Sequence, residues 1–431
     1  MRPKAFAAAV AALFVCTGPV CVQALAQASS EAAVAPSTEV PLAQRPSLFG
    51  GPGSVEDEWR QRGFDLNANV VEFGQGLVSG DGKNNGWQWA GKATAKLIVD
   101  GAKAGLWDGF SINAIGEYQW GKNINGYGGT LFPVNTALTF PQNGGSGGDF
   151  SITFTQRFSK EFAVTVGKFD MIDVVSRTPL LGGGGIDTFW NACLASPITG
   201  LVPPYLTGFA FDFTTPAGLV SAMIYDPQGA QQTSGLDHWG QNGISGRVSW
   251  LIPITIDGKS GYQTFTAVGT TQTNIDLADL PYLILPPGIR PTVNVKTGSW
   301  YLGYSFQQYL VQSPDNPREG WGIFGQIGFT DANPNPYRWA GLIGVGGTSP
   351  IPGRNLDRFG VAYFHYAFSQ ELENSAHLFH FNLGAEYGTE LFYNAAITPW
   401  FRVAADLQFI RPGNHSLGNA TLAGVSAQIK F

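Results

Sequence analysis

The chain ends in a run of alternating apolar and polar side chains, and this alternation recurs along much of its length. In residues 424–431 (GVSAQIKF) every second side chain is apolar, and the last of them is the terminal Phe431. Successive side chains of a strand point to opposite faces, so a period of two predicts strands with one apolar and one polar face. The same period occurs at residues 89–99, 110–120, 300–306, 323–330 and 401–409. The clearest helix candidate is Ser54–Gln61, with Ser54 as its N-cap.

Two architectures accommodate such strands: a soluble sandwich, whose apolar faces form a core, and a membrane barrel, whose apolar face meets lipid. The composition favours the barrel. Asp, Glu, Lys and Arg make up only 13% of the 431 residues, about half of the roughly 25% found in soluble domains. Aromatic residues near the ends of proposed strands, such as Trp107 and Trp120, resemble interfacial girdles. We therefore predict an all-β fold, a transmembrane antiparallel β-barrel with a short N-terminal periplasmic helix.

The length of the chain sets the size of the predicted barrel. A membrane-spanning helix needs about 20 apolar residues, and no stretch beyond residue 28 approaches that length. A spanning strand with its turn and loop takes roughly 22–25 residues. The chain after the first 28 residues therefore has room for about 16 strands, a number that encloses an aqueous channel.

The N-terminus has the pattern of an export signal. Two basic residues precede an Ala-rich apolar stretch, which closes with small residues. We expect residues 1–28 to be a signal peptide that is cleaved after Ala28, with Ala26 as the alternative site and an N-terminal membrane anchor as the competing interpretation. Residues 29–53 are rich in Pro, Ala and Ser and are predicted to be flexible. Residues 54–431 are predicted to form one outer-membrane β-barrel domain.

The composition argues against several other classes of protein. Three cysteines in the whole chain argue against an iron–sulfur protein, a Cys-rich zinc protein or a disulfide scaffold. A formal net charge of -6 argues against a general nucleic-acid binder, which needs a basic face. His365 is the only histidine in a strong strand pattern, and it has no clear serine partner. We therefore expect no catalytic residue, no metal and no cofactor.

Five segments in a fixed order carry a family resemblance: Lys96–Asn123, Thr165–Asp170, Phe189–Phe213, Gly320–Ser369 and Glu390–Gly413. The most specific is the fourth, which contains GWGIFGQIGFTDANPNPYRWAGLIGVGG and GRNLDRFGVAYFHYAFS. Together with the C-terminal GVSAQIKF they resemble the carbohydrate-selective porin (OprB) family of Gram-negative outer membranes. The resemblance implies a 16-stranded porin in the outer membrane of a Gram-negative bacterium. It also implies passive diffusion of glucose and similar small sugars.

The resemblance carries over pore-lining roles where individual positions match. Glu390 corresponds to the acidic residue before an aromatic pair, and Asp406 to the aspartate after T-P-W. Arg354 and Asp357 belong to a GR-x-x-D element. Among the departures, Asn394 stands where the family commonly has a basic residue. This departure leaves the fold unaffected but bears on the substrate preference.

Charged side chains on the predicted strands are the candidates for lining the pore. A charge on the lipid face costs about 2–4 kcal/mol at the bilayer midplane for Arg or Lys, so these side chains should face the lumen. Each is either a solvated wall residue or a contact for the substrate. Arg402 with Asp406 is either a structural pair across the lumen or part of a ligand site. The candidates, from strand parity, are Lys92, Lys96, Glu117, Arg247, Glu390, Arg402 and Asp406.

Two long loops are candidates for narrowing the channel. They are Leu180–Pro204 and Thr271–Thr292, and the second contains the Pro-rich stretch DLPYLILPPGIRP. Long loops often carry function. Either loop folds into the lumen, or it forms an external cap over the rim.

The predicted function is passive, carbohydrate-selective diffusion into the periplasm. The alternatives are a general or anion-biased porin and, more remotely, an outer-membrane barrel enzyme or a structural barrel. The expected partners are small sugars, outer-membrane lipid and lipopolysaccharide, and no nucleic acid. The sequence leaves open whether the protein is a monomer or a homotrimer.

Overall fold

The computed structural model describes residues 40–81, 86–286 and 288–431. Residues 41–431 belong to one compact unit. The predicted signal peptide, residues 1–28, and residues 29–39 of the predicted flexible segment lie outside the described residues.

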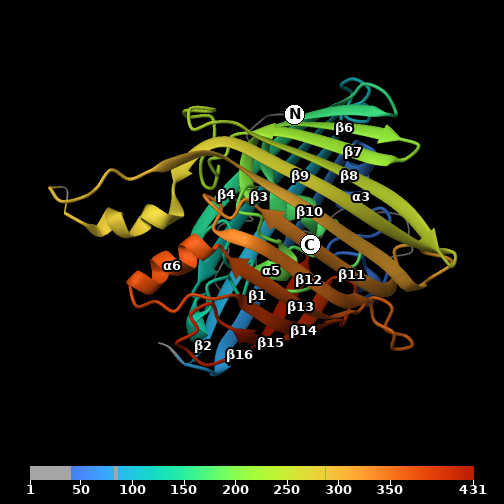
Figure 1. Cartoon of the computed structure of the whole chain (residues 1–431). Helices are drawn as coiled ribbons and strands as arrows, with labels where there is room; N and C mark the ends of the chain where they lie inside the picture. Colours follow the sequence, from blue (N-terminus) through green and yellow to red (C-terminus); the bar gives the residue numbers. More distant parts are fainter. Residues whose placement is uncertain (1–39, 82–85, 287) are drawn as a thin grey trace. The chain divides into compact units, whose positions relative to one another are not determined.

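Sixteen antiparallel strands of the described chain close into a barrel, and the predicted fold class is confirmed (Figure 1). Each strand pairs with its neighbours in sequence, and β1 pairs with β16 to close the sheet. The strands are β1 Phe64–Ser79, β2 Trp87–Asp100, β3 Phe110–Gly121, β4 Gly147–Arg157, β5 Phe162–Asp170, β6 Tyr205–Thr215, β7 Gly218–Tyr225, β8 Ser245–Ile256, β9 Lys259–Ile275, β10 Val295–Gln312, β11 Gly320–Thr330, β12 Tyr337–Thr348, β13 Arg358–Phe368, β14 Glu386–Ala396, β15 Phe401–Arg411 and β16 Ala420–Lys430.

The two faces of the wall differ as the period of two predicts. Along β15, Val403 and Phe409 are exposed on the outside, whereas Asp406 and Gln408 are buried on the inside. An apolar outer face suits a lipid environment, because hydrocarbon cannot solvate polar groups. Along the middle of β15 the inner face therefore carries the polar side chains.

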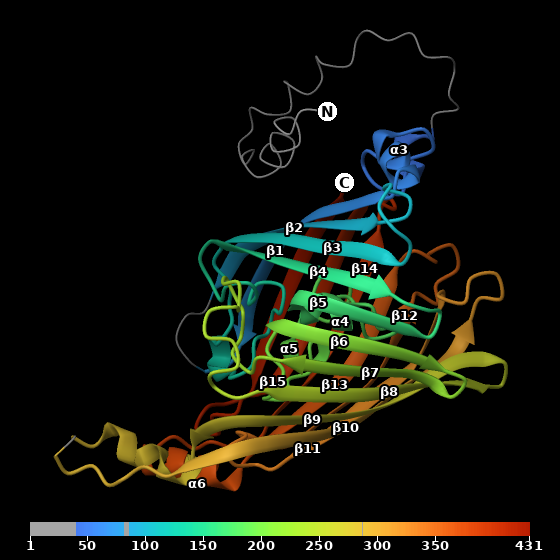
Figure 2. The same cartoon turned by 90° about the horizontal axis from the view of Figure 1, so that it is seen from above.

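The two ends of the barrel are distinct. The chain terminus lies at the end with the short turns, where the ring of Phe431 is 5.9 Å from that of Phe49. The predicted N-terminal helix forms as α3, Val55–Gln61, beside β1 (Figure 2). Its N-cap is Ser54, whose Oγ accepts a hydrogen bond from the Asp57 N–H at 3.2 Å. Outer-membrane barrels have short turns on the periplasmic side, so this end is the periplasmic one.

The remaining helices are short and lie in the connections. None in the described part of the chain is long and apolar enough to cross a membrane. They are η1 Leu42–Gln44, η2 Tyr127–Gly129, α4 Met171–Ser176, α5 Ala192–Ala195, η3 Leu277–Ile284 and α6 Gln370–Leu378.

The two candidate loops go to different places. The β5–β6 connection, residues 171–204 and here called the inner loop, carries α4 and α5 and lies within the ring of strands (Figure 2). The β9–β10 connection, residues 276–294 and here called the outer loop, projects beyond the barrel beside α6 (Figure 1). Of the two alternatives for each loop, the inner loop takes the inward one and the outer loop the external one.

Candidate channel constriction

Side chains at the start and in the middle of the inner loop cap its two short helices. Asp170, the last residue of β5, caps α4 because its Oδ1 accepts hydrogen bonds from the N–H groups of Ile172 (2.9 Å) and Asp173 (3.1 Å). Asn191 caps α5, with its Oδ1 accepting from the Cys193 N–H at 2.9 Å. Both caps satisfy N–H groups that a helix leaves free at its start. The chain can therefore form two short helices inside the barrel without leaving these groups unpaired.

An apolar seat on the inner wall holds the loop. The ring of Phe189 lies 4.8 Å from that of Phe392 and 5.8 Å from that of Phe324. Trp190 packs edge-on against Phe73 at 5.0 Å. All four of these aromatic partners and Trp190 itself are buried. Aromatic side chains of this size dominate packing energies where they are fully buried, so the loop is fixed against the wall.

A buried carboxylate fixes the loop backbone at the same place. Glu390 on β14 is fully buried and accepts hydrogen bonds from the N–H groups of Trp190 and Asn191, the second at 3.0 Å. The Asn191 side chain donates to Gln408 Oε1 at 3.1 Å, and Gln408 in turn donates to Asp406 Oδ1 at 2.9 Å. Two adjacent backbone N–H groups that bond to one side chain fix both the position and the direction of the loop. Two predicted pore residues, Glu390 and Asp406, thus lie at the anchor of the inner loop.

A second carboxylate anchors the β3–β4 connection. Glu386, the first residue of β14, is fully buried and accepts from the N–H groups of Leu131 (2.7 Å), Phe132 (3.0 Å) and Gly413 (2.8 Å). Residues 122–146 are therefore tied to the inner wall as well. The β3–β4 connection therefore lies against the inner wall in addition to the inner loop.

An ion pair on β2 and β3 joins two further predicted residues. Lys92 Nζ is 2.6 Å from Glu117 Oε1 and donates to the carbonyl of Phe140 at 2.9 Å. The Tyr205 hydroxyl donates to Glu117 Oε2 at 2.6 Å. Both charged side chains are buried. The pair therefore links the wall to the β3–β4 connection and to the first residue of β6, which follows the inner loop.

Lys96 meets the inner loop directly. Its Nζ is 2.6 Å from Asp173 Oδ1, and Arg177 Nη2 is 2.5 Å from Asp173 Oδ2. Burial raises the pKa of Asp173, but the hydrogen bond from Lys96 and the charge of Arg177 hold the pKa below its ordinary value. This cluster is only partly covered, so it presents both signs of charge to the lumen.

Three cations, here called the basic row, face the lumen at the periplasmic ends of their strands. They are Arg358, Arg402 and Lys430, and the loop residue Asp187 lies 3.4 Å from Lys430 Nζ. Arg402 also donates to Asn394 Oδ1 at 3.3 Å. Burial raises the pKa of Asp187, but the charges of the basic row outweigh it and keep the pKa below its ordinary value. The Nε atoms of the two arginines are buried and have no hydrogen-bond partner in the described chain.

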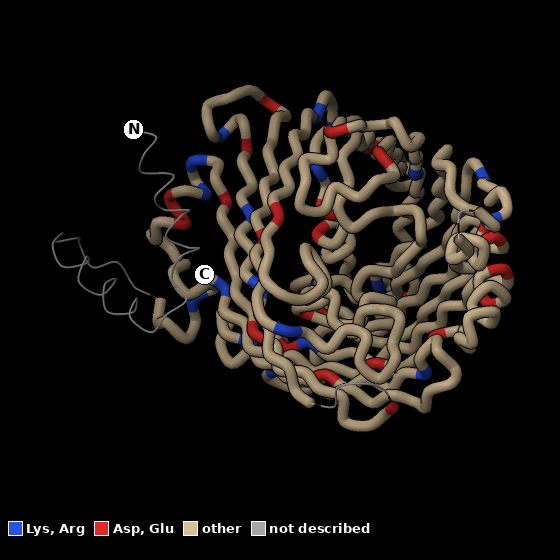
Figure 3. The backbone as a smooth tube through the Cα atoms, turned by 90° about the vertical axis from the view of Figure 1, so that its left-hand side faces the viewer, with Lys and Arg blue, Asp and Glu red and all other residues tan. Residues whose placement is uncertain are grey.

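The seven predicted residues all face inward but do not form one site. Arg247 on β8 stands apart, and its Nη1 donates to Met223 Sδ at 4.0 Å. Arg402 and Asp406 do not pair with each other: the first bonds to Asn394 and the carbonyl of Leu356, the second to Gln408. Whether any of the seven contacts a sugar stays a prediction. Figure 3 shows basic and acidic residues interspersed along a chain in which most residues are uncharged.

The GR-x-x-D element lies in the periplasmic turn between β12 and β13. Arg354 Nε is 2.7 Å from Asp357 Oδ2, which also accepts from the Tyr393 hydroxyl at 2.6 Å. Asp357 Oδ1 accepts from the N–H of Ala396 at 2.9 Å. The aspartate thus ties two neighbouring turns together, a structural role away from the inner loop.

Several charged residues of the candidate constriction were missed from the sequence. Asp173, Arg177 and Asp187 lie in a loop without periodicity, so no sequence pattern marks them. Arg358 and Lys430 have the inward parity that selected Arg402. They sit at strand ends, and parity applied up to those ends would have included them.

Comparison with known proteins fits this architecture. The model of the carbohydrate-selective porins of the OprB family matches residues 84–431. The chain belongs to the OprB family. It is a sugar-selective porin of the Gram-negative outer membrane. No curated protein sequence matches it.

Solved structures share the fold of this OprB-family chain at low sequence identity. The high-pH structure of OprB from Pseudomonas putida superposes with a TM-score of 0.77 at 16% identity, covering 90% of this chain and 99% of the other. The low-pH structure of the same protein gives 0.53 at 14% identity, with the same coverage. The outer-membrane channel DcaP of Acinetobacter baumannii gives 0.52 at 9% identity, covering 85% of this chain and 97% of the other. At these identities the likeness speaks for the fold alone.

Proposed function

We propose that the protein lets glucose and similar small sugars diffuse passively through a constriction formed by the inner loop and the facing wall. The observation that supports this is the seat of Trp190 and Asn191 on Glu390, because it fixes a loop inside a barrel of channel size. No reaction is needed for transport of this kind. Neither a catalytic residue nor a cofactor or metal has a role in the proposal.

Selectivity would come from the charged groups that line the narrow part. Sugars lose water contacts there, and charge-assisted hydrogen bonds to their hydroxyl groups replace them. The Lys96–Asp173–Arg177 cluster and the basic row with Asp187 offer both donors and acceptors. A neutral polyol can use both signs, whereas an ion is repelled by one of them.

The basic row favours a second candidate function, an anion-biased porin. Its three cations all act on one carboxylate, that of Asp187. Clefts lined by one sign of charge concentrate the opposite ion. The bias would appear as a reversal potential on the anion side in a salt gradient.

Liposome swelling with purified protein tests the two candidates. Sugar diffusion predicts that glucose and arabinose enter faster than amino acids of matched size. Equal rates for both classes would remove the sugar preference and leave the general or anion-biased porin. Absence of any conductance in a planar bilayer would end the channel interpretation.

The outer face supports a proposal on the surroundings. Side chains such as Phe150, Phe209 and Leu302 are exposed on the outside of the barrel, as contact with lipid requires. We propose that this face contacts outer-membrane lipid and lipopolysaccharide. The assembly is a monomer or a homotrimer, which the mass of the complex in mild detergent decides.

A further inference from the structure

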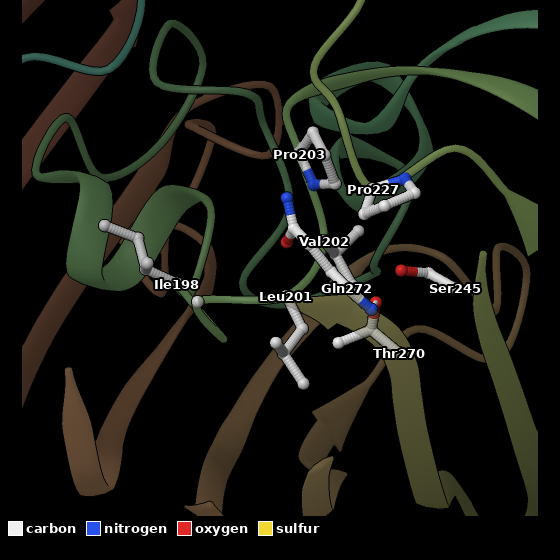
Figure 4. A pocket seen from close by; sticks show the side chains of 9 residues that line it. Ile198, Leu201, Val202, Pro203, Pro227, Ser245, Thr270 and Gln272 are labelled. Carbon is white, nitrogen blue, oxygen red and sulfur yellow. Dashed lines mark hydrogen bonds between the residues drawn. The ribbon is translucent and has the colours of Figure 1, made fainter. Parts of the chain in front are cut away.

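A cavity lies at the long-loop end of the barrel, between the inner wall and residues 198–203 at the end of the inner loop (Figure 4). Its volume is about 210 Å³, many times the roughly 10–15 Å³ that one water molecule requires by this measure. A solute the size of one sugar ring is therefore the appropriate scale. The lining residues are Ile198, Gly200, Leu201, Val202, Pro203, Pro227, Ser245, Thr270 and Gln272.

One hydroxyl in this cavity is buried without a partner. Ser245, the first residue of β8, is completely buried, and its Oγ has no hydrogen bond in the described part of the chain. The neighbouring Tyr225 hydroxyl donates to the carbonyl of Leu201 at 3.0 Å, so it does not donate to Ser245, and the Ser245 oxygen keeps its acceptor capacity for a ligand. A buried polar group without a partner costs about 1–3 kcal/mol. The free Ser245 hydroxyl thus indicates a place for a polar solute.

Strand register puts further polar groups next to this hydroxyl. Ser245 pairs directly with Thr270 on β9, and both side chains face the lumen. Thr270 Oγ1 accepts from the Gln272 N–H at 3.1 Å, which leaves its own hydroxyl proton for a ligand. The Gln272 side chain has the same inward parity. The wall side of the cavity therefore offers two hydroxyls and one amide.

The opposite side of the cavity is apolar. Leu201, Val202 and Pro203 come from the inner loop, and Pro227 comes from the β7–β8 connection. In Figure 4 the Ser245 side chain points from the strand toward this loop segment. A sugar ring has hydroxyl groups at its edge and C–H groups on its faces, and it matches such a division. None of the lining side chains is ionisable, which favours a neutral solute over a sugar acid.

We propose that this cavity binds one neutral monosaccharide at the extracellular mouth, before the sugar reaches the constriction. The site rests on the proposed function and adds to it a binding position ahead of the constriction. Sugar hydroxyls would pair with Ser245, Thr270 and Gln272, while a ring face lies on Leu201 and Val202. Binding here raises the local sugar concentration, so it acts mainly when sugar is scarce.

Two substitutions on the wall test the site through the concentration dependence of glucose uptake into liposomes. Ser245→Val replaces the hydroxyl with a methyl group and adds bulk, and Gln272→Leu removes the amide at a partly exposed position. The loss of one or two hydrogen bonds should raise the half-saturating glucose concentration about threefold to tenfold. Ion conductance should not change, because neither side chain is charged.

The matched control is Ser249→Ala. Ser249 is a buried inward serine on the same strand and does not line the cavity. The half-saturating glucose concentration of the Ser249→Ala variant should equal that of the wild type. Because Gln272 is near the rim, that variant remains informative if Ser245→Val does not fold.

The outcomes separate this site from the function on which it rests. If the wild type takes up glucose saturably and Gln272→Leu leaves the half-saturating concentration unchanged, the site is refuted while sugar diffusion stands. If the wild type passes glucose no faster than amino acids of matched size, the proposed function fails and the site with it. A rise in the two cavity variants but not in Ser249→Ala supports the site.

Discussion

The inner and outer loops are both long and rich in Pro or Gly, yet only one enters the barrel. Trp190 in the inner loop is completely buried, whereas Ile284 in the outer loop is 70% exposed. The inner loop is met by acceptors and rings that the wall provides, above all Glu390 and Phe392. The difference teaches that the wall, and not the composition of the loop, decides where a loop goes.

The outer loop makes its contacts at its base. Asn333 donates to Asp276 Oδ1 at 2.8 Å and accepts from the Leu277 N–H at 3.1 Å. The Ser375 hydroxyl of α6 donates to the Leu277 carbonyl at 2.6 Å. These bonds hold the start of the loop against α6 and leave η3 outside the lumen. Changes in this loop should not reach the channel.

Among the substitutions that test the difference between the two loops, Trp190→Ala should have the largest effect on channel conductance. Truncating a buried Trp costs about 3–5 kcal/mol, and here the cost falls on the seat of the inner loop. Single-channel conductance should rise and become noisier as the loop leaves the wall. Tyr282→Ala in the outer loop is the control and should keep the wild-type conductance. Equal currents in both variants would mean that Trp190 does not hold the constriction.

Glu390→Gln should have a smaller effect of the same kind. The amide keeps one acceptor but turns an NH₂ group toward an N–H, which leaves about 1–3 kcal/mol of unmet hydrogen bonding. We expect more frequent current fluctuations at nearly unchanged mean conductance. A record as quiet as the wild type would contradict the anchoring role of this carboxylate.

Arg402→Ala should act on charge and not on the loop. Arg402 makes no ion pair within the described chain and takes part in the basic row, so its removal weakens the attraction for anions. The reversal potential in a salt gradient should move toward cation preference, and the block of current by sugar should change. Unchanged values of both would place Arg402 outside the narrow part.

The smallest expected effect is that of moderate acid. Asp173 and Asp187 have pKa values held below the ordinary value of about 3.9 for aspartate. A lowered pKa means that each carboxylate stabilises the folded loop above that value, and that this contribution disappears as the pH falls through the lowered pKa. The charge that these two carboxylates present to the lumen should therefore stay constant from pH 7 to about pH 4.5, and the reversal potential in a salt gradient should stay constant with it. A step within that interval would show that other groups set the charge of the constriction.

The direction of a side chain can be predicted from the sequence where it follows the two-residue period of a strand. Parity placed Lys92, Glu390 and Asp406 on the inside, because every second residue of a strand shares a face. It could not show that Glu390 accepts hydrogen bonds from backbone N–H groups 200 and 199 residues away in sequence. Loop positions such as Asp187 follow no period, and their partners depend on the folded path. The barrel was thus predictable from local patterns, whereas the constriction was not.

Thiol modification at Asp187 tests most directly whether the inner loop lines the conducting path. Cys193 is completely buried, so the wild-type channel should be insensitive to a bulky charged thiol reagent. Asp187→Cys should lose most of its single-channel current when the reagent is added, and Ile284→Cys in the outer loop should lose none. An Asp187→Cys channel that reacts fully and still conducts like the wild type would contradict the account.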